Sequence, residues 1–279
     1  MSQYAATFSF SLLIYIFSCL LVNAQYLHFD KQITYQLKYN PDTADMRRQA
    51  TETFELFIND SISFFESTNK NIFDSILQQQ YKEGNTFGDY ASASTYRSKF
   101  RFAIIKSIDA ISFYEYEADF GPDLVRCDEP NRWDWNITNE EKTLHNLNCQ
   151  LATVQYAGRR WEAWFCADIP IFDGPYKFGG LPGLIISLSS ADKSWNFEVI
   201  DMDLNTAKKL VFNQYPARKV VQMHKADFFK EKRTMEKNRM LLHESKGRIK
   251  FKDAQSKLNM TNNYQKYLKK NSNKIELVP

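Results

Sequence analysis

The sequence is poor in the residues and patterns from which metal sites and nucleophilic active sites are built. Among its 279 residues are four cysteines and four histidines, and the histidines are scattered along the chain (His28, His145, His224 and His243). His145 and Cys149 are the only close pair, and two ligands at such a spacing are weak evidence for a metal. The Gly-x-Ser-x-Gly pattern of serine hydrolases is absent. We therefore expect no metal and no cofactor.

The N-terminus also lacks something, because no Lys or Arg precedes its apolar run. Residues 8–22 are apolar apart from three serines, and Val22-Asn23-Ala24 places small or moderate residues before Gln25. This pattern predicts a signal peptide over residues 1–24, cleaved after Ala24. A retained anchor is the alternative, although about 15 apolar residues fall short of the ~20 that span a membrane. We expect an exported protein, in the periplasm, at the cell surface or secreted.

Charge is unevenly distributed along the chain. The net charge is +3, yet residues 218–279 contain 17 Lys and Arg against 6 Asp and Glu, so the remainder is acidic. Beyond Gly247 the chain is polar and basic with few large apolar residues, which predicts a disordered tail over 247–279. Weak attraction of this tail to an anionic membrane surface is possible on electrostatic grounds. Aromatic residues are few there, so no stacking platform for bases, and no nucleic acid partner, is expected.

Short alternating segments dominate residues 25–222 and predict β-strands. About ten such segments follow one another without the βαβ rhythm of parallel sheets, so we expect a mainly β (α+β) domain with a curled antiparallel sheet, half-barrel or sandwich-like. Residues 223–246 predict one C-terminal helix. The main strand candidates are 33–39, 54–58, 61–67, 100–104, 111–116, 124–127, 133–137, 149–156, 161–169, 184–189, 195–199 and 208–212.

A segment rich in glycine and proline, residues 174–185, interrupts this pattern. It has four glycines and two prolines in twelve residues, so it requires backbone conformations that other residues rarely adopt. Pro182-Gly183 suits a type II turn. A phosphate-binding loop is excluded, because the segment runs into a strand and lacks the Lys-Ser/Thr of such loops. We expect it to cross an edge of the sheet and to be packed by Phe178 and Leu181.

A hairpin around Ala157-Gly158 precedes this segment and constrains two cysteines. If the turn centres on these two residues, Cys149 and Cys166 lie opposite each other; if it centres on Gly158-Arg159, they are diagonal. Opposed Cβ atoms are slightly far apart for a disulfide but within adjustment. We predict a Cys149–Cys166 disulfide, with Cys127–Cys149 as the second choice.

The hairpin and the segment after it resemble one known family. The residues that carry the resemblance are Cys149, Ala152, Tyr156-Ala157-Gly158-Arg159, Trp161, Ala163-Trp164-Phe165, Asp168-Ile169-Pro170-Ile171, Gly174-Pro175, Lys177-Phe178 and Gly180-Leu181-Pro182-Gly183-Leu184-Ile185. They are similar to the signature of the GLPGLI family, exported proteins of Gram-negative bacteria, and Trp133-x-Trp135-x-Ile137 resembles its tryptophan segment. The resemblance implies a cell-envelope or secreted protein, and it implies no activity.

Three hypotheses of function remain open. The first, which we favour, is non-catalytic binding of an apolar or peptide ligand or of an envelope partner. The second is an extracytoplasmic hydrolase near the glycine-proline segment, supported only by a polar and aromatic set: Arg159, Trp161, Trp164, Asp168 and Lys177. Clustering of these residues in an open cleft would favour the enzyme, and burial as a packing network would favour the binder. The third is a structural surface or assembly component that uses the basic tail.

Overall fold

The structure is a computed structural model that describes residues 25–83, 94–116, 123–212 and 219–278. The predicted signal peptide lies outside these residues. The described chain forms one open sheet of twelve strands in the order β14-β7-β6-β5-β4-β3-β2-β12-β11-β10-β9-β8, and a separate two-stranded sheet, β1-β13. Neighbouring strands are antiparallel except for β14 and β7. The mainly β fold with a large antiparallel sheet is thus confirmed.

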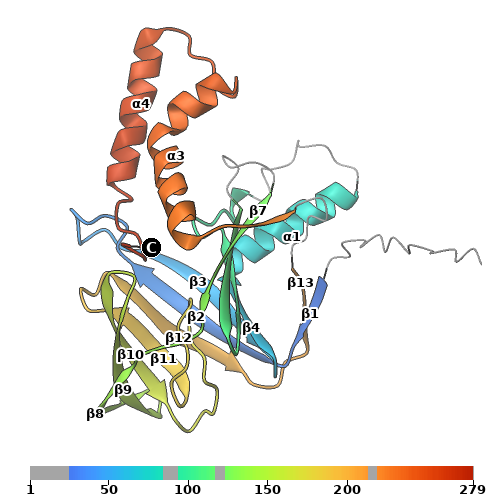
Figure 1. Cartoon of the computed structure of the whole chain (residues 1–279), viewed down its shortest axis with the longest axis vertical. Coiled ribbons are helices and arrows are strands. Elements are labelled where there is room, and N and C mark those ends of the chain that lie inside the picture. The colour runs from blue at the N-terminus through green and yellow to red at the C-terminus, as the bar shows by residue number, and fades with distance from the viewer. Residues whose placement is uncertain (1–24, 84–93, 117–122, 213–218, 279) are drawn as a thin grey trace, which may run out of the picture.

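The strands lie largely where the alternating segments predict them, and the described residues contain two helices besides the predicted one (Figure 1). Their bounds are β1 (Gln25–Phe29), β2 (Lys31–Tyr39), β3 (Ala50–Ile58), β4 (Ile62–Ser67), α1 (Thr68–Lys82), β5 (Phe102–Ser107), β6 (Ala110–Tyr116), β7 (Leu124–Pro130), β8 (Asn136–Leu144), β9 (Leu147–Tyr156), β10 (Arg159–Cys166), β11 (Leu184–Ser190), β12 (Trp195–Asp203), β13 (Lys208–Phe212), β14 (Val220–Gln222), α3 (Lys225–Ser245) and α4 (Ala254–Lys269).

The glycine-proline segment, which connects β10 to β11, is buried against strands from the other half of the sheet. Lys106 on β5 donates hydrogen bonds to the carbonyls of Gly174 and Phe178, and Tyr35 on β2 donates to the carbonyl of Ile185 at 2.7 Å. Phe178 and Leu181 are both buried in the main core, as expected. The sheet therefore curls around this segment, which fills its inner face.

The β9–β10 hairpin has the register that places Cys149 opposite Cys166. Ala157 and Gly158 form its turn with φ of 50° and 81°, and Phe165 pairs with Gln150. The predicted disulfide is nevertheless wrong, because all three cysteines of the described chain are free and buried. Directly opposed Cβ atoms are further apart than the ~3.8 Å typical of a disulfide, and the Cys149 thiol donates to the Leu147 carbonyl instead.

Three local predictions differ from the structure. The strand predicted from Trp133 begins only at Asn136, because the tryptophans before it turn toward the glycine-proline segment. The strand 208–212 pairs with β1 in the small sheet and not in the main one. Around Pro182 the Gly183 amide donates to the Leu181 carbonyl at 2.8 Å, which makes a three-residue turn in place of type II.

The predicted disordered tail is also wrong. Residues 254–269 form α4, whose N-cap Asp253 accepts a hydrogen bond from the Ser256 amide, and residues 273–278 return to the β-domain (Figure 1). Local composition suggested disorder because few apolar residues follow Gly247. The order comes instead from polar contacts with residues 100 or more positions earlier in the chain.

Candidate functional site

A buried ionic cluster surrounds Lys177 of the glycine-proline segment. Its ammonium group lies 2.5 Å from Glu129 Oε1 at the end of β7 and 2.7 Å from Glu276 Oε1 near the C-terminus. Lys225, the first residue of α3, bridges the same two carboxylates at 3.1 and 3.0 Å. Lys177 is 1% exposed and Glu276 is 3% exposed. Two cations and two carboxylates thus neutralise one another, with Lys177 and Glu276 buried and Lys225 and Glu129 each keeping 17% of the side chain exposed.

Two tyrosines complete this cluster. Tyr176 donates to Glu276 at 2.6 Å, and Tyr156 at the end of β9 donates to both oxygens of Glu129. Burial and the nearby carboxylates, Glu276 first among them, raise the pKa of both tyrosines far above the usual range, so both remain hydrogen-bond donors. In this cluster the two tyrosines therefore donate hydrogen bonds and the two glutamates accept them.

The electrostatics of the cluster favour its ionised state. Burial opposes the charge of Glu276, but Lys177 and Lys225 outweigh it and lower the pKa of this carboxyl to about 2. Burial likewise acts against the charge of Lys225, and Glu276 and Glu129 raise its pKa nonetheless. A cation over an aromatic face adds to this, since the Lys177 ammonium lies 4.8 Å from the Phe113 ring centroid.

Arg159, the first residue of β10, holds the segment that carries Glu276. Its guanidinium donates to the carbonyls of Lys274 and Ile275 at 2.8 and 3.2 Å and to the side chain of Asn273. It also pairs with Asp192 at 2.8 Å. The segment is joined to the hairpin turn by further backbone bonds, from the amides of residues 277 and 278 to the carbonyl of residue 157. Arg159 therefore acts as a clamp on residues 273–278, which we call the C-terminal segment.

Lys106 is a second buried lysine, on the other side of the glycine-proline segment. It pairs with Asp173 and bonds the two carbonyls named above. Burial lowers the pKa of Lys106, while Asp173 acts in the opposite direction. The buried ammonium thus satisfies backbone carbonyls that have no strand partner, which is what a non-repetitive segment inside a core needs.

The candidate polar and aromatic residues lie in different parts of the structure. Arg159 and Lys177 both contact the C-terminal segment, and Trp161 is buried in the core, where its indole donates to the Tyr156 carbonyl at 3.3 Å. Asp168 is exposed. Trp164 lines an open cleft elsewhere. These residues do not converge on one solvent-open site.

The glycines of the motif have a steric role, shown most clearly at Gly183. A Cβ at this position would lie 2.1 Å from the Cys166 carbonyl oxygen, and its φ is +155°. Gly180 has a φ of +76° and packs against Trp133. The absence of a side chain at Gly183 therefore allows the close approach of the glycine-proline segment to the end of β10.

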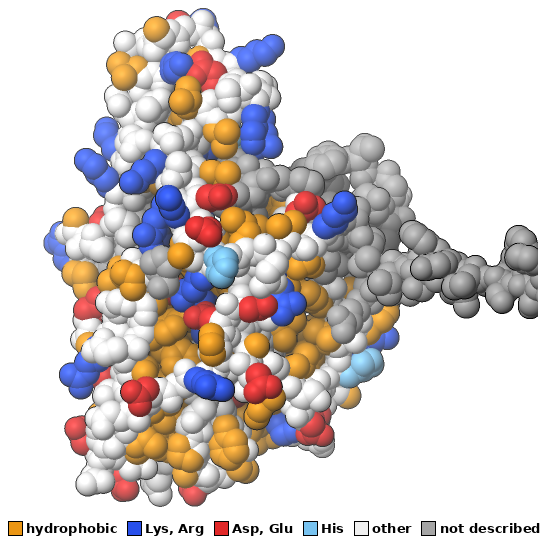
Figure 2. All heavy atoms as spheres, in the orientation of Figure 1, with side chains coloured by type: hydrophobic (Ala, Val, Ile, Leu, Met, Phe, Trp, Pro, Cys, Tyr) orange, Lys and Arg blue, Asp and Glu red, His pale blue; other side chains and the backbone are white. Residues whose placement is uncertain are grey.

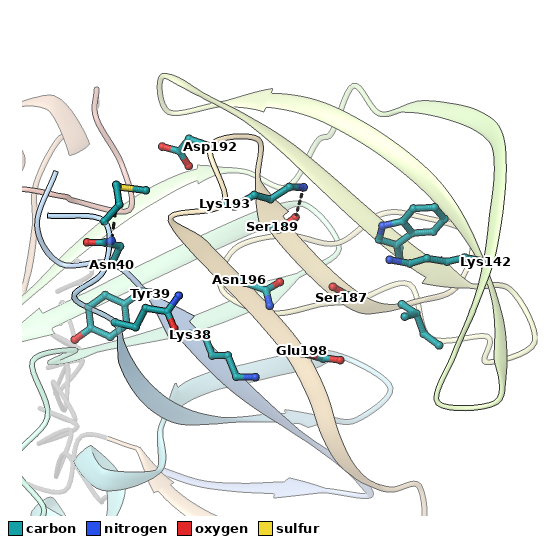
Figure 3. A pocket seen from close by; sticks show the side chains of 14 residues that line it. Lys38, Tyr39, Asn40, Lys142, Ser187, Ser189, Asp192, Lys193, Asn196 and Glu198 are labelled. Atoms are coloured by element: carbon teal, nitrogen blue, oxygen red, sulfur yellow. Dashed lines mark hydrogen bonds between the residues drawn. The ribbon is translucent and has the colours of Figure 1, made fainter. Parts of the chain in front are cut away.

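An open cleft of about 570 Å³ lies on the outward face of β2, β12, β11 and β10 and is bordered by β8. Figure 3 shows Asn196, Ser187 and Glu198 between Lys38 on one side and Lys142 on the other. Its lining residues are Lys38, Tyr39, Asn40, Met46, Gln49, Lys142, Leu144, Trp164, Ser187, Ser189, Asp192, Lys193, Asn196 and Glu198. Cations, carboxylates, amides and hydroxyls thus surround a few apolar groups.

Within the cleft, aromatic and polar groups adjoin along the strand register. Trp164 pairs with Ser187, which pairs with Glu198, and the Lys142 ammonium lies 4.0 Å above the Trp164 ring. His145 bonds Glu198 at 3.2 Å, and in the described part of the chain it makes no hydrogen bond to Ser187. Among the residues that the structure describes, no group of three or more His, Cys, Asp or Glu could hold a metal ion.

Comparisons with known proteins add a short family match. Residues 156–187 match the model of a family described as "Protein of unknown function (Porph_ging)". The matched residues include the hairpin turn, Arg159 and the glycine-proline segment through Ser187, and the match is compatible with the resemblance to the GLPGLI family. No curated protein matches the chain.

Two solved structures show limited similarity to this chain. They are entitled "Structure of PNGF-II in P21 space group" and "Structure of PNGF-II in C2 space group", each with a TM-score of 0.47 and with 12% and 11% sequence identity. They cover 73% and 72% of this chain, which spans about a third (32%) of each of theirs. Similarity at this level carries no information on activity.

Most partners in the buried clusters were not foreseen from the sequence. No sequence pattern marked five of these partners as site residues: Glu129, Tyr176, Lys225, Lys106 and Asp173. Glu276 offered one signal, because it is the only acidic residue after Asp253 in an otherwise basic stretch.

Among the described residues, no helix is long and apolar enough to cross a membrane.

Proposed function

We propose that this is an exported, non-catalytic binding protein whose open cleft receives an extended peptide. The observation that carries the proposal is the contrast between two adjoining regions, the buried ionic cluster and the open cleft, which meet at Asp192. The motif residues Arg159 and Lys177 are buried and fully occupied with the C-terminal segment, whereas the open cleft presents polar side chains and Trp164 to solvent. The motif region then serves as the scaffold, and the cleft beside it serves as the seat of the ligand.

The lining of the cleft favours a peptide over a purely apolar ligand. Amide and hydroxyl groups from Asn196, Ser187 and Ser189 can bond a peptide backbone, and Lys38 and Glu198 offer charges of both signs. An apolar ligand would leave these groups without partners, at a cost in binding free energy. The indole of Trp164 provides the rigid aromatic contact on which binding sites commonly depend.

A hydrolase is supported by no comparable observation. Catalysis by a serine needs a base within hydrogen-bond reach of the hydroxyl. His145 lies beside Glu198 and not beside Ser187 in the described structure. The cysteines are buried, and burial raises the pKa of Cys127 and Cys149 to about 11, which makes both poor nucleophiles.

The proposal is tested by retention of peptides on immobilised protein, with tryptic peptides of an envelope extract as the probe. We expect the wild-type chain to retain a defined subset, and W164A and N196A each to weaken that retention by about tenfold or more. F172A is the matched control, since Phe172 is an exposed aromatic residue (64%) outside the cleft. Equal retention by wild type, W164A and N196A would overturn the proposal.

A further inference from the structure

The helical hairpin of α3 and α4 projects away from the β-domain (Figure 1). Phe228, near the base, is the only buried residue of α3, and α4 has none. The end furthest from the sheet, residues 241–260, is here called the arm tip. Its exposed apolar side chains are available to a partner.

The arm tip combines cations with exposed apolar side chains. Leu241, Leu258 and Met260 are 63%, 52% and 45% exposed. From residue 244 to residue 257 there are two carboxylates and five cations: Lys246, Arg248, Lys250, Lys252 and Lys257. Figure 2 shows hydrophobic side chains interspersed with Lys and Arg over the upper part of the arm.

Both carboxylates of this stretch are already engaged. Asp253 caps α4 by accepting from the Ser256 amide at 2.6 Å, and Glu244 pairs with Lys257 at 2.7 Å. No carboxylate among the described residues forms an ion pair with Lys250 or Lys252, which are both exposed. Lys250 and Lys252 therefore give the arm tip two exposed positive charges.

The arm is held in its projecting position at both ends. Phe228 anchors the start of α3 in the main core, and the C-terminal segment after α4 is clamped by Arg159 and by the Lys177 cluster. The two helices are also tied together, since Tyr264 donates to the Glu236 carbonyl at 2.8 Å. The tip is consequently presented at a fixed distance from the sheet.

This geometry points to one partner: we propose that the arm tip docks on the surface of a bilayer that contains anionic phospholipid. Lysines flanking exposed leucine and methionine side chains allow electrostatic attraction and shallow insertion together. Single-stranded nucleic acid is commonly bound by aromatic rings exposed for stacking, and the only aromatic residue of the tip, Phe251, is half-buried beneath Lys257. An acidic protein surface would satisfy the cations without any use for exposed leucines.

The test is co-sedimentation with vesicles of phosphatidylcholine, with and without phosphatidylglycerol. The chain should start at Gln25, so that the apolar N-terminal run does not itself enter the vesicles. We expect binding only when phosphatidylglycerol is present. K250Q/K252Q should weaken it by about 25-fold, since each cation near an anionic surface contributes about fivefold, and L241S/L258S should weaken it by about tenfold.

A matched control removes two exposed arginines from the β-domain, R47Q/R132Q, and changes net charge equally. We expect this variant to bind as the wild type does. Equal weakening by the control would overturn the proposal, because binding would then follow net charge alone. Full competition by duplex DNA together with normal binding of L241S/L258S would also overturn it, in favour of a polyanion site.

Discussion

The Lys177 cluster predicts that one carboxylate close to the chain end controls the stability of the whole arrangement. In E276Q the side chain keeps its shape but loses its charge, so Lys177 and Lys225 would share Glu129 alone. The pKa of Glu276 is lowered from 4.5 to about 2, which corresponds to ~3 kcal/mol of preference for the charged form. Removing one member of a buried ion pair costs a similar amount, about 3–5 kcal/mol.

The assay is chemical denaturation of wild type and E276Q at a series of pH values. At pH 7 we expect E276Q to be less stable by about 3 kcal/mol. In the unfolded chain Glu276 takes up a proton near pH 4.5, and in the folded chain only near pH 2. The unfolded state therefore binds more protons between these values, so this contribution is lost as the pH falls from about 5 toward 2, and the two chains converge.

The control is E244Q, which removes a carboxylate paired with Lys257 at the surface and should change the free energy of unfolding by about 0–1 kcal/mol. If the C-terminal segment detaches without global unfolding, the loss should appear as faster hydrogen exchange of the Leu277 amide, which bonds the Ala157 carbonyl. Unchanged stability and unchanged exchange of this amide in E276Q at pH 7 would refute the reasoning.

Two further substitutions test the scaffold. G183A should abolish a cooperative thermal transition, because its Cβ would meet the Cys166 carbonyl, whereas G247A, with no atom within 4 Å, should lower stability by about 1 kcal/mol at most; normal melting of G183A would contradict this. R159K should accelerate exchange of the Leu277 amide by about thirtyfold, since lysine cannot replace the forked contacts with residues 273–275. R160K, at the exposed neighbouring position, should leave that rate unchanged, and equal rates in both variants would count against the clamp.

The parts of the fold that the sequence predicted depend on local patterns. The β9–β10 hairpin and its register follow from the alternation on both sides of Ala157-Gly158, whose positive φ values fit a two-residue turn. The glycines of the glycine-proline segment predicted an unusual backbone conformation, and at Gly183 only glycine tolerates the close contact with the neighbouring backbone. Both signals lie within a few residues of the structure that they specify.

The parts that were missed depend on contacts distant in the sequence. Nothing near Lys177 indicates Glu276, which lies about 100 residues later, and nothing near Arg159 indicates a peptide carbonyl as its partner. The order of residues 247–278 was missed for the same reason, since composition measures apolar content and not a single well-placed carboxylate. Likewise, Trp164 and Arg159 were predicted to share one candidate site. The two residues are an odd number of positions apart on the same strand, so their side chains face opposite sides of the sheet.

The position of Glu276 has a consequence for the order of folding. Lys177 is built into the core of the β-domain, yet one of its two carboxylate partners is added only after α3 and α4. Until residue 276 has been synthesised and brought back to the β-domain, the buried Lys177 ammonium has only the Glu129 carboxylate as its ion-pair partner from this pair. The domain therefore reaches full stability only in a chain that extends past both helices. A chain that ends within the arm should be degraded by proteases more readily.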